Sequence, residues 1–132
     1  MSMSTAARIS LTLILALGVA SCRTAPVLTP EISVSSVATA GAHSAAQVAQ
    51  AIKSAGSELG WTIEDAGAGH LTGRLVVRGH QAVVDIPYSK DSVRIVYKDS
   101  RNLRYREGKI HRNYNNWVKN LSEAIKRRLA NS

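Results

Sequence analysis

The sequence predicts an α+β domain: a two-layer sandwich in which two helices cover one face of a four-stranded antiparallel meander, in the order α-β-β-β-β-α. Residues 61–99 alternate apolar and polar side chains, as strands do when only one face of a sheet is buried. Segments 44–59 and 113–129 instead carry apolar residues at spacings of three and four, which is typical of helices. Both helices need an apolar surface to cover, and the sheet offers one.

The first residues have the layout of a secretory signal. Arg8 precedes an apolar run over residues 11–20, and small residues follow it. The run is shorter than the roughly 20 apolar residues that span a bilayer. We therefore expect a signal peptide over residues 1–21. The alternative is an ordinary signal cleaved after Ala20, which would leave a soluble periplasmic protein.

The end of this segment resembles the lipobox of bacterial lipoproteins, in residues Val19, Ala20, Ser21 and Cys22. In such proteins the signal is cut just before the cysteine, which is then lipidated. Cys22 is the only cysteine of the chain, and an unmodified thiol would be a liability in an oxidising compartment. The resemblance implies a membrane anchor on Cys22. Arg23 follows, and a residue other than Asp there favours the periplasmic face of the outer membrane, with the inner membrane as the alternative.

Residues 22–43 hold two prolines, many small residues and few charges, and they predict a lipidated N-terminus and flexible linker. Within them, residues 32–34 alternate and offer a short edge strand. The folded domain is expected over residues 44–132. Ser44 is the expected N-cap of the first helix, and Gln47 completes a capping box.

The turns between the predicted strands suggest a register. Gly79 and His80 suit a two-residue hairpin turn with glycine first. This register places Arg74 opposite Asp85 as a cross-strand ion pair. Between the first two strands, the pairing sets Trp61 over a strand glycine, Gly73, whose missing side chain the indole would replace.

The second helix is expected over residues 113–129, with Asn113 as its N-cap. Trp117 lies at the centre of its apolar stripe, so we expect that side chain to be buried. Basic residues in the last turns complement the helix dipole.

The segment before this helix, residues 100–112, is irregular and suggests a small hairpin about Glu107 and Gly108. Loops of this length inside a compact domain are often functional. Its basic side chains are the candidate site for an anionic partner: Arg101, Arg104, Arg106, Lys109 and Arg112. The competing interpretation is a solvated, charged loop.

The chain carries 17 Lys and Arg against 9 Asp and Glu, and removal of the signal takes away only Arg8. In an exported protein this surplus points away from nucleic acid. It favours anionic lipid, lipopolysaccharide phosphates or an acidic protein surface as the partner. A merely soluble, well-charged surface is the alternative.

The residues that commonly carry catalysis form no recognisable pattern. The four histidines lack metal-ligand spacing, and no nucleophile–histidine–acid or phosphate-loop motif occurs. We therefore expect no metal, no cofactor and no catalytic residue, and a non-enzymatic binding or envelope-maintenance module. The alternative is an envelope-polymer hydrolase or transferase. An inhibitor of lysozyme-like enzymes is disfavoured, because such targets are often basic themselves.

The later part of the chain looks like a group of small, uncharacterised lipoproteins of Proteobacteria. The resemblance covers most of residues 48–125 and is clearest in Ile110, His111, Arg112, Asn113, Tyr114, Asn115, Asn116 and Trp117. It implies a lipoprotein of the Gram-negative envelope. It brings no activity, substrate or catalytic residue to this sequence.

Overall fold

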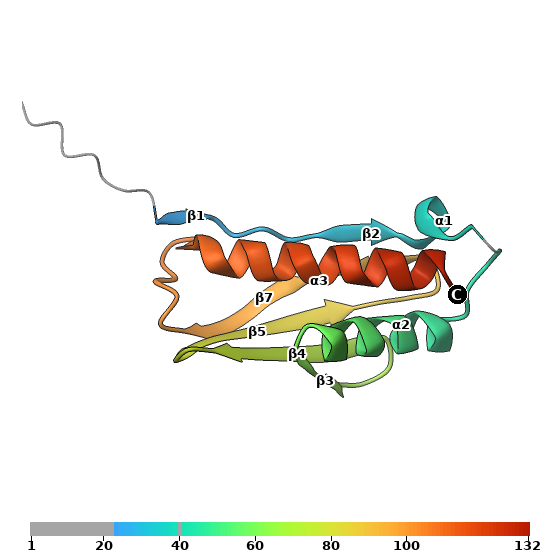
Figure 1. Cartoon of the computed structure of the whole chain (residues 1–132), viewed down its shortest axis with the longest axis horizontal. Coiled ribbons are helices and arrows are strands. Elements are labelled where there is room, and N and C mark those ends of the chain that lie inside the picture. The colour runs from blue at the N-terminus through green and yellow to red at the C-terminus, as the bar shows by residue number, and fades with distance from the viewer. Residues whose placement is uncertain (1–22, 40) are drawn as a thin grey trace, which may run out of the picture.

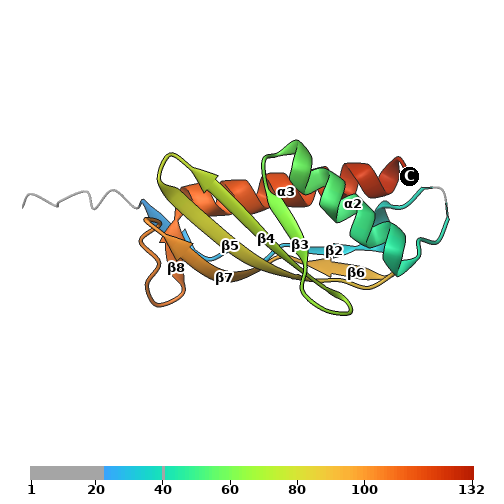
Figure 2. The ribbon, with the colours of Figure 1, turned by 90° about the horizontal axis from the view of Figure 1, so that it is seen from below.

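The computed structural model describes residues 23–39 and 41–132, so the expected signal peptide and Cys22 lie outside the described residues. The predicted α+β class is confirmed. The main sheet is antiparallel with the order β3-β4-β5-β7. Its strands are β3 (Thr62–Asp65), β4 (His70–Val77), β5 (His80–Pro87) and β7 (Val96–Arg101). Helices α2 (Ala45–Glu58) and α3 (Arg112–Ala130) lie behind this sheet in Figure 2, on one face of it.

The segment expected to be a linker is part of the fold. It forms β1 (Thr24–Pro26), β2 (Glu31–Ser33) and the short helix α1 (Val34–Val37). β1 pairs with β8 (Lys109–His111), and β2 pairs with β6 (Ser92–Arg94). In Figure 1, β1 and β2 run alongside α3. Ile32 and Val34 are 1% and 2% exposed. The linker expectation is therefore wrong for residues 24–37, because these apolar side chains complete the core.

Helix α2 begins as the sequence predicts. The Ser44 hydroxyl accepts from the Gln47 backbone N–H at 3.1 Å, and the Gln47 side chain accepts from the Ser44 N–H at 2.8 Å. This reciprocal capping box satisfies two backbone donors at the helix start. Val48 and Ile52, one turn apart, are fully buried against the sheet.

Helix α3 differs from its prediction in two details. His111 is the N-cap in place of Asn113, because its Nδ1 accepts from the Asn113 backbone N–H at 3.1 Å. Trp117 is only partly buried at the margin of the core. Tyr114, one turn earlier, is the fully buried aromatic side chain of the helix.

The hairpin between β4 and β5 turns one residue earlier than predicted. Val77 pairs with His80, so Arg78 and Gly79 form the turn, with φ of 50° and 80°. Two left-handed residues in a two-residue loop match the twist of a hairpin, as in a type I′ turn. Arg78 thus adopts a conformation that is uncommon for residues other than glycine.

The earlier turn moves every predicted β4–β5 pair by two residues. Arg74 lies opposite Val83, so the expected Arg74–Asp85 pair is wrong. Asp85 instead lies opposite Thr72, with its carboxylate 3.8 Å from Nδ1 of His70. A shift of two preserves which face each side chain occupies, so the core is unaffected.

Trp61 covers Gly73, as expected. A Cβ added to Gly73 would lie 3.3 Å from Cε3 of the indole, although the residue paired with Gly73 in the ladder is Ile63. The bare backbone of Gly73 therefore makes room for the buried indole ring.

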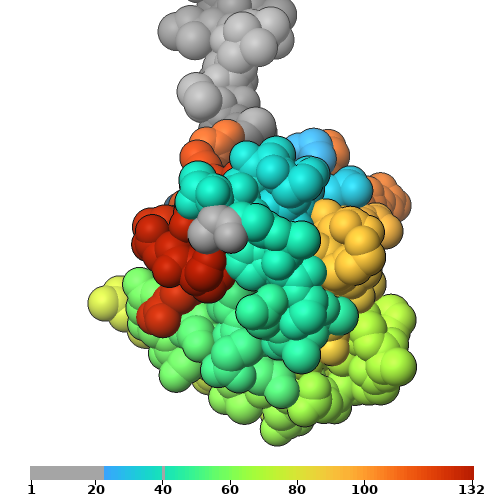
Figure 3. Space-filling model, turned by 90° about the vertical axis from the view of Figure 1, so that its right-hand side faces the viewer, coloured from blue at the N-terminus to red at the C-terminus, as the bar shows by residue number. Residues whose placement is uncertain are grey.

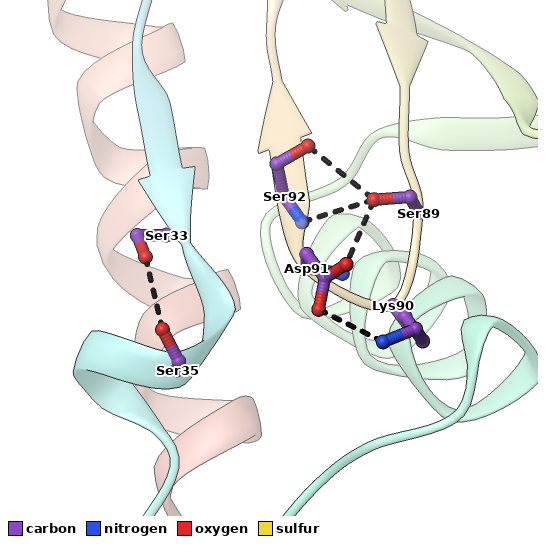
Figure 4. A network of polar contacts seen from close by, with 6 residues as sticks. All are labelled: Ser33, Ser35, Ser89, Lys90, Asp91 and Ser92. Carbon is purple, nitrogen blue, oxygen red and sulfur yellow. Dashed lines mark hydrogen bonds and ion pairs between the residues drawn. The ribbon is translucent and has the colours of Figure 1, made fainter.

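The end of the molecule farthest from β1 has paired charges. In the turn before β6, Ser89 Oγ accepts from the backbone N–H groups of Asp91 and Ser92, and Lys90 Nζ lies 3.3 Å from the Asp91 carboxylate (Figure 4). The Asp91 carbonyl accepts from the N–H of Val34, which joins this turn to α1. Figure 3 views this end, where α1, the start of α2 and the C-terminus meet.

Candidate functional site

The structure brings the five predicted binding residues to one end of the domain. Arg101 ends β7, Arg104 and Arg106 lie in the following loop, Lys109 begins β8, and Arg112 is the first residue of α3. All five are exposed. In Figure 1 the loop, the start of α3 and β1 share this end of the molecule.

The loop has a defined shape. The predicted small hairpin is confirmed: Arg106 and Lys109 exchange backbone hydrogen bonds of 2.9 and 3.0 Å around the turn formed by Glu107 and Gly108. The His111 N–H donates to the carbonyl of Leu103 at 2.8 Å, and Leu103 is 1% exposed. The basic side chains therefore project from a loop that is closed at its base and anchored in the core.

Two further arginines, Arg23 and Arg78, lie at this end, although sequence reasoning did not assign them to it. The Arg112 N–H donates to the carbonyl of Arg23 at 3.0 Å. The Asn102 side-chain amide donates to the carbonyl of Gly79 at 2.7 Å, which brings the turn at Arg78 against the loop. We call the resulting group the basic end: Arg23, Arg78, Arg101, Arg104, Arg106, Lys109 and Arg112.

Arg23 was missed because it falls in the presumed linker. Arg78 was missed because the predicted turn consisted of Gly79 and His80 and so left Arg78 outside it. The only sequence signal for Arg78 was the adjacent Gly79, which marks a turn but not what the turn packs against. Both placements depend on hydrogen bonds between segments far apart in the chain.

The charge surplus of the described chain is concentrated at the basic end. The basic end contains seven basic side chains and one acidic residue, Glu107. The remaining described residues contain nine basic and eight acidic side chains. Among the described residues, every ion pair involves cations outside the basic end. None of the seven cations is therefore neutralised by an ion pair within the described chain, and Glu107 is the one carboxylate among them.

A depression of about 350 Å³ lies within the basic end. We call it the basic groove; its lining residues are Thr24, Arg104, Arg106, Glu107 and Lys109. Three segments form its walls: β1, the loop between β7 and β8, and β8. It lacks the converging carboxylates or nucleophiles of a hydrolytic site.

An aromatic stack supports the loop beside this groove. Tyr105 is 47% exposed, and its ring lies parallel to that of Tyr97 with centroids 4.1 Å apart. Tyr97 in turn meets the buried Tyr114 edge-on at 5.7 Å. The stack fixes the loop between Arg104 and Arg106 against the core.

The supporting tyrosines add no negative charge to this end at neutral pH. Burial raises the pKa of Tyr97, against the lowering effect of its hydrogen bond to Ser100. Burial also raises the pKa of Tyr114, with the neighbouring Tyr97 as a second cause. Both hydroxyls therefore stay neutral, and the positive potential of the basic end is undiminished.

Other surface features carry less chemistry. A depression of about 440 Å³ between α2 and α3 is lined by neutral side chains and Arg128, which is paired with Glu58 at 3.2 Å. Within residues 23–39 and 41–132, no three His, Cys, Asp or Glu side chains gather as a metal site would require. No helix in this part of the chain is both long and apolar enough to cross a membrane.

No protein-family model, curated protein or solved structure matches this chain.

Proposed function

We propose that this protein is a lipid-anchored envelope lipoprotein with a non-enzymatic binding domain, held by a lipid on Cys22 at the periplasmic face of the outer membrane. Its basic end docks on the anionic head groups of that membrane. The observation that carries this proposal is the segregation of charge: seven exposed cations and a single carboxylate at one end of the described domain. The resemblance to proteobacterial lipoproteins agrees with the proposal and stays a prediction.

The position of Arg23 supports the proposal. Arg23 directly follows Cys22, and its carbonyl is bound by the N–H of Arg112. Consecutive Cα atoms are about 3.8 Å apart, and the screening length at physiological salt is about 8 Å. A lipid on Cys22 would therefore hold the basic end within electrostatic range of the head groups.

The strand that follows the anchor is held firmly to the same end. Asn115 accepts from the backbone N–H of Leu28 and donates to the carbonyl of Pro26, both at 2.9 Å. The Val27 N–H donates to the carbonyl of Gly108 at 2.9 Å. These bonds extend the β1–β8 ladder, so the anchored N-terminus and the basic hairpin form one unit.

Vesicle binding tests the docking. Each Lys or Arg near an anionic membrane contributes about 1 kcal/mol. Replacing both Arg104 and Arg106 with Gln in the mature chain without its lipid should weaken binding to anionic vesicles about thirtyfold, or about 2 kcal/mol. Sedimentation at low and high salt, on anionic and neutral vesicles, measures the effect.

The matched control replaces Arg94 and Lys119 with Gln, which lowers the net charge equally but leaves the basic end intact. Its vesicle affinity should remain within a factor of about 3 of the wild type, since screening weakens charges beyond about 8 Å. Equal binding to anionic and neutral vesicles, or insensitivity to salt, would contradict the proposal.

A further inference from the structure

We infer that the basic groove is a discrete site for a phosphomonoester, and that its ligand is the terminal phosphate of a lipid head group. The inference rests on the proposed docking and adds selectivity to it. General attraction between charges does not distinguish one anionic lipid from another, whereas the local arrangement of hydrogen-bond donors in the groove can. The segments that line the groove, the β7–β8 loop and β1, lie together at one end of the molecule in Figure 1.

Two cations of the groove face each other across the hairpin. Arg106 and Lys109 are directly paired, with both backbone hydrogen bonds formed, so their side chains leave the same face a few ångströms apart. Like charges in this position destabilise a hairpin. Within the described chain neither forms an ion pair with a carboxylate. An anion bound between them would remove the repulsion.

The register of β1 and β8 adds a hydroxyl to the same face. Pro26 lies opposite Lys109 and Thr24 opposite His111, so alternation places Thr24 on the face of Lys109. Ile110, which lies between Lys109 and His111 in β8, points to the opposite face and is fully buried. The Thr24 hydroxyl is thus available to donate to an anion in the groove.

The donor set fits a tetrahedral dianion. Arg104 and Arg106 each offer a planar fork of N–H groups that can bind two phosphate oxygens, and Lys109 offers a compact charge. Three cations and Glu107 give the groove a formal charge of +2. A phosphomonoester carries about −1.5 to −2 at neutral pH, whereas a phosphodiester lipid carries a single charge. The charge balance therefore favours the monoester.

The groove is formed before any ligand binds. Asn102 and Arg104 have left-handed φ of 58° and 53°, and the buried Leu103 between them holds the loop in place. A left-handed arginine is energetically costly, and such residues persist only where their surroundings enforce them. The stacked ring of Tyr105 completes this support from the other side. A preformed site binds without the entropy cost of ordering a loop.

The test uses the mature chain with Cys22→Ser and two kinds of vesicle. One contains phosphatidic acid, a monoester, and the other phosphatidylglycerol, a diester, each in phosphatidylcholine and matched in surface potential. We expect wild-type affinity to be at least about tenfold higher for the phosphatidic acid vesicles, a difference of about 1.4 kcal/mol. Circular dichroism and the thermal midpoint verify that each variant is folded.

Two double variants remove the same charge from the same end. Arg104→Gln with Lys109→Gln alters the groove, whereas Arg78→Gln with Arg101→Gln lies outside it. The groove variant should lose the preference for phosphatidic acid. The control variant should bind both vesicle types more weakly while keeping the preference.

A wild type without preference, or variants that lose it equally, would overturn the phosphate site while leaving the general docking intact. Failure to bind either anionic vesicle would overturn both. A titration with inorganic phosphate at constant ionic strength separates the two sources of the ligand. Tight binding of inorganic phosphate with no preference between vesicles would identify a free phosphate site and overturn the lipid assignment.

Discussion

Tyr114 lies beneath the basic end with its ring fully buried. Within the described part of the chain its hydroxyl has no hydrogen-bond partner. An unsatisfied buried hydroxyl costs about 1–3 kcal/mol relative to a paired one. The hydroxyl therefore lowers the stability of the fold, while the ring supports Tyr97 and, through it, the exposed loop.

Replacing Tyr114 with Phe should stabilise the protein by about 1 kcal/mol, because the ring stays and the unpaired hydroxyl goes. Chemical denaturation measures the change. The control is Tyr97→Phe, which removes a hydroxyl that lies 2.9 Å from that of Ser100 and should not stabilise. A less stable Tyr114→Phe variant would show that this hydroxyl has a partner.

The raised pKa of Tyr114 predicts how the stability of the protein depends on pH. The folded state holds this proton more tightly than the unfolded chain, in which tyrosine titrates near pH 10. The free energy of unfolding is therefore independent of this group below about pH 10 and falls as the pH rises further, by up to about 1.4 kcal/mol per pH unit. The loss should be shallower in Tyr114→Phe. Unfolding at pH 9 to 11.5 compares the two proteins.

At the scale of elements, the packing of α2 on β3 depends on a glycine inside the helix. A Cβ on Gly56 would collide with the Ile63 side chain and lie 3.4 Å from Cβ of Trp61. The Trp61 N–H also donates to the Gly56 carbonyl at 2.8 Å, which ties the helix end to the strand that follows. The close approach requires a residue without a side chain.

Gly56→Ala should therefore destabilise the domain by about 1–3 kcal/mol, the usual cost of overpacking. Helix propensity alone would favour alanine by about 1 kcal/mol, so the sign of the effect is the test. The control is Ser57→Ala, at the exposed neighbouring position. A thermal midpoint that rises in Gly56→Ala would mean that the helix and strand are farther apart than described.

At the scale of the whole molecule, the two ends differ in charge. The basic end adjoins the expected anchor, and at the far end Lys90 and Asp91 pair with each other. Such a molecule has a preferred orientation in the field of an anionic surface. The proposed lipid and the basic end would then act together, since a lipid chain combined with basic residues anchors more stably than either alone.

Cys22→Ser tests the anchor. Without the thiol no lipid can attach, so the precursor should stay uncut and the acylated mature form should disappear. Mass spectrometry and membrane fractionation of cells expressing each form measure this. A wild-type mature protein that carries no acyl mass on Cys22 would refute the anchor while leaving the vesicle experiments meaningful.

Local patterns in the sequence determine much of this protein. The capping box at Ser44, the hairpin at Glu107 and Gly108, and the alternation that divides the sheet into two faces all depend on residues close together in the chain. The five predicted cations also reach one end together, because they occupy only twelve residues. These features follow from short-range backbone and side-chain chemistry.

Only the tertiary structure decided the rest. Gly79 permits either of two hairpin turns that match the strand twist, and the turn formed by Arg78 and Gly79 is the one whose Gly79 carbonyl accepts from the distant Asn102 side chain. The presumed linker becomes β1 because it meets β8 and Asn115, more than eighty residues away. Thr24 enters the groove by the same pairing. Contacts between such distant residues depend on the packing of the entire core, and no local pattern encodes them.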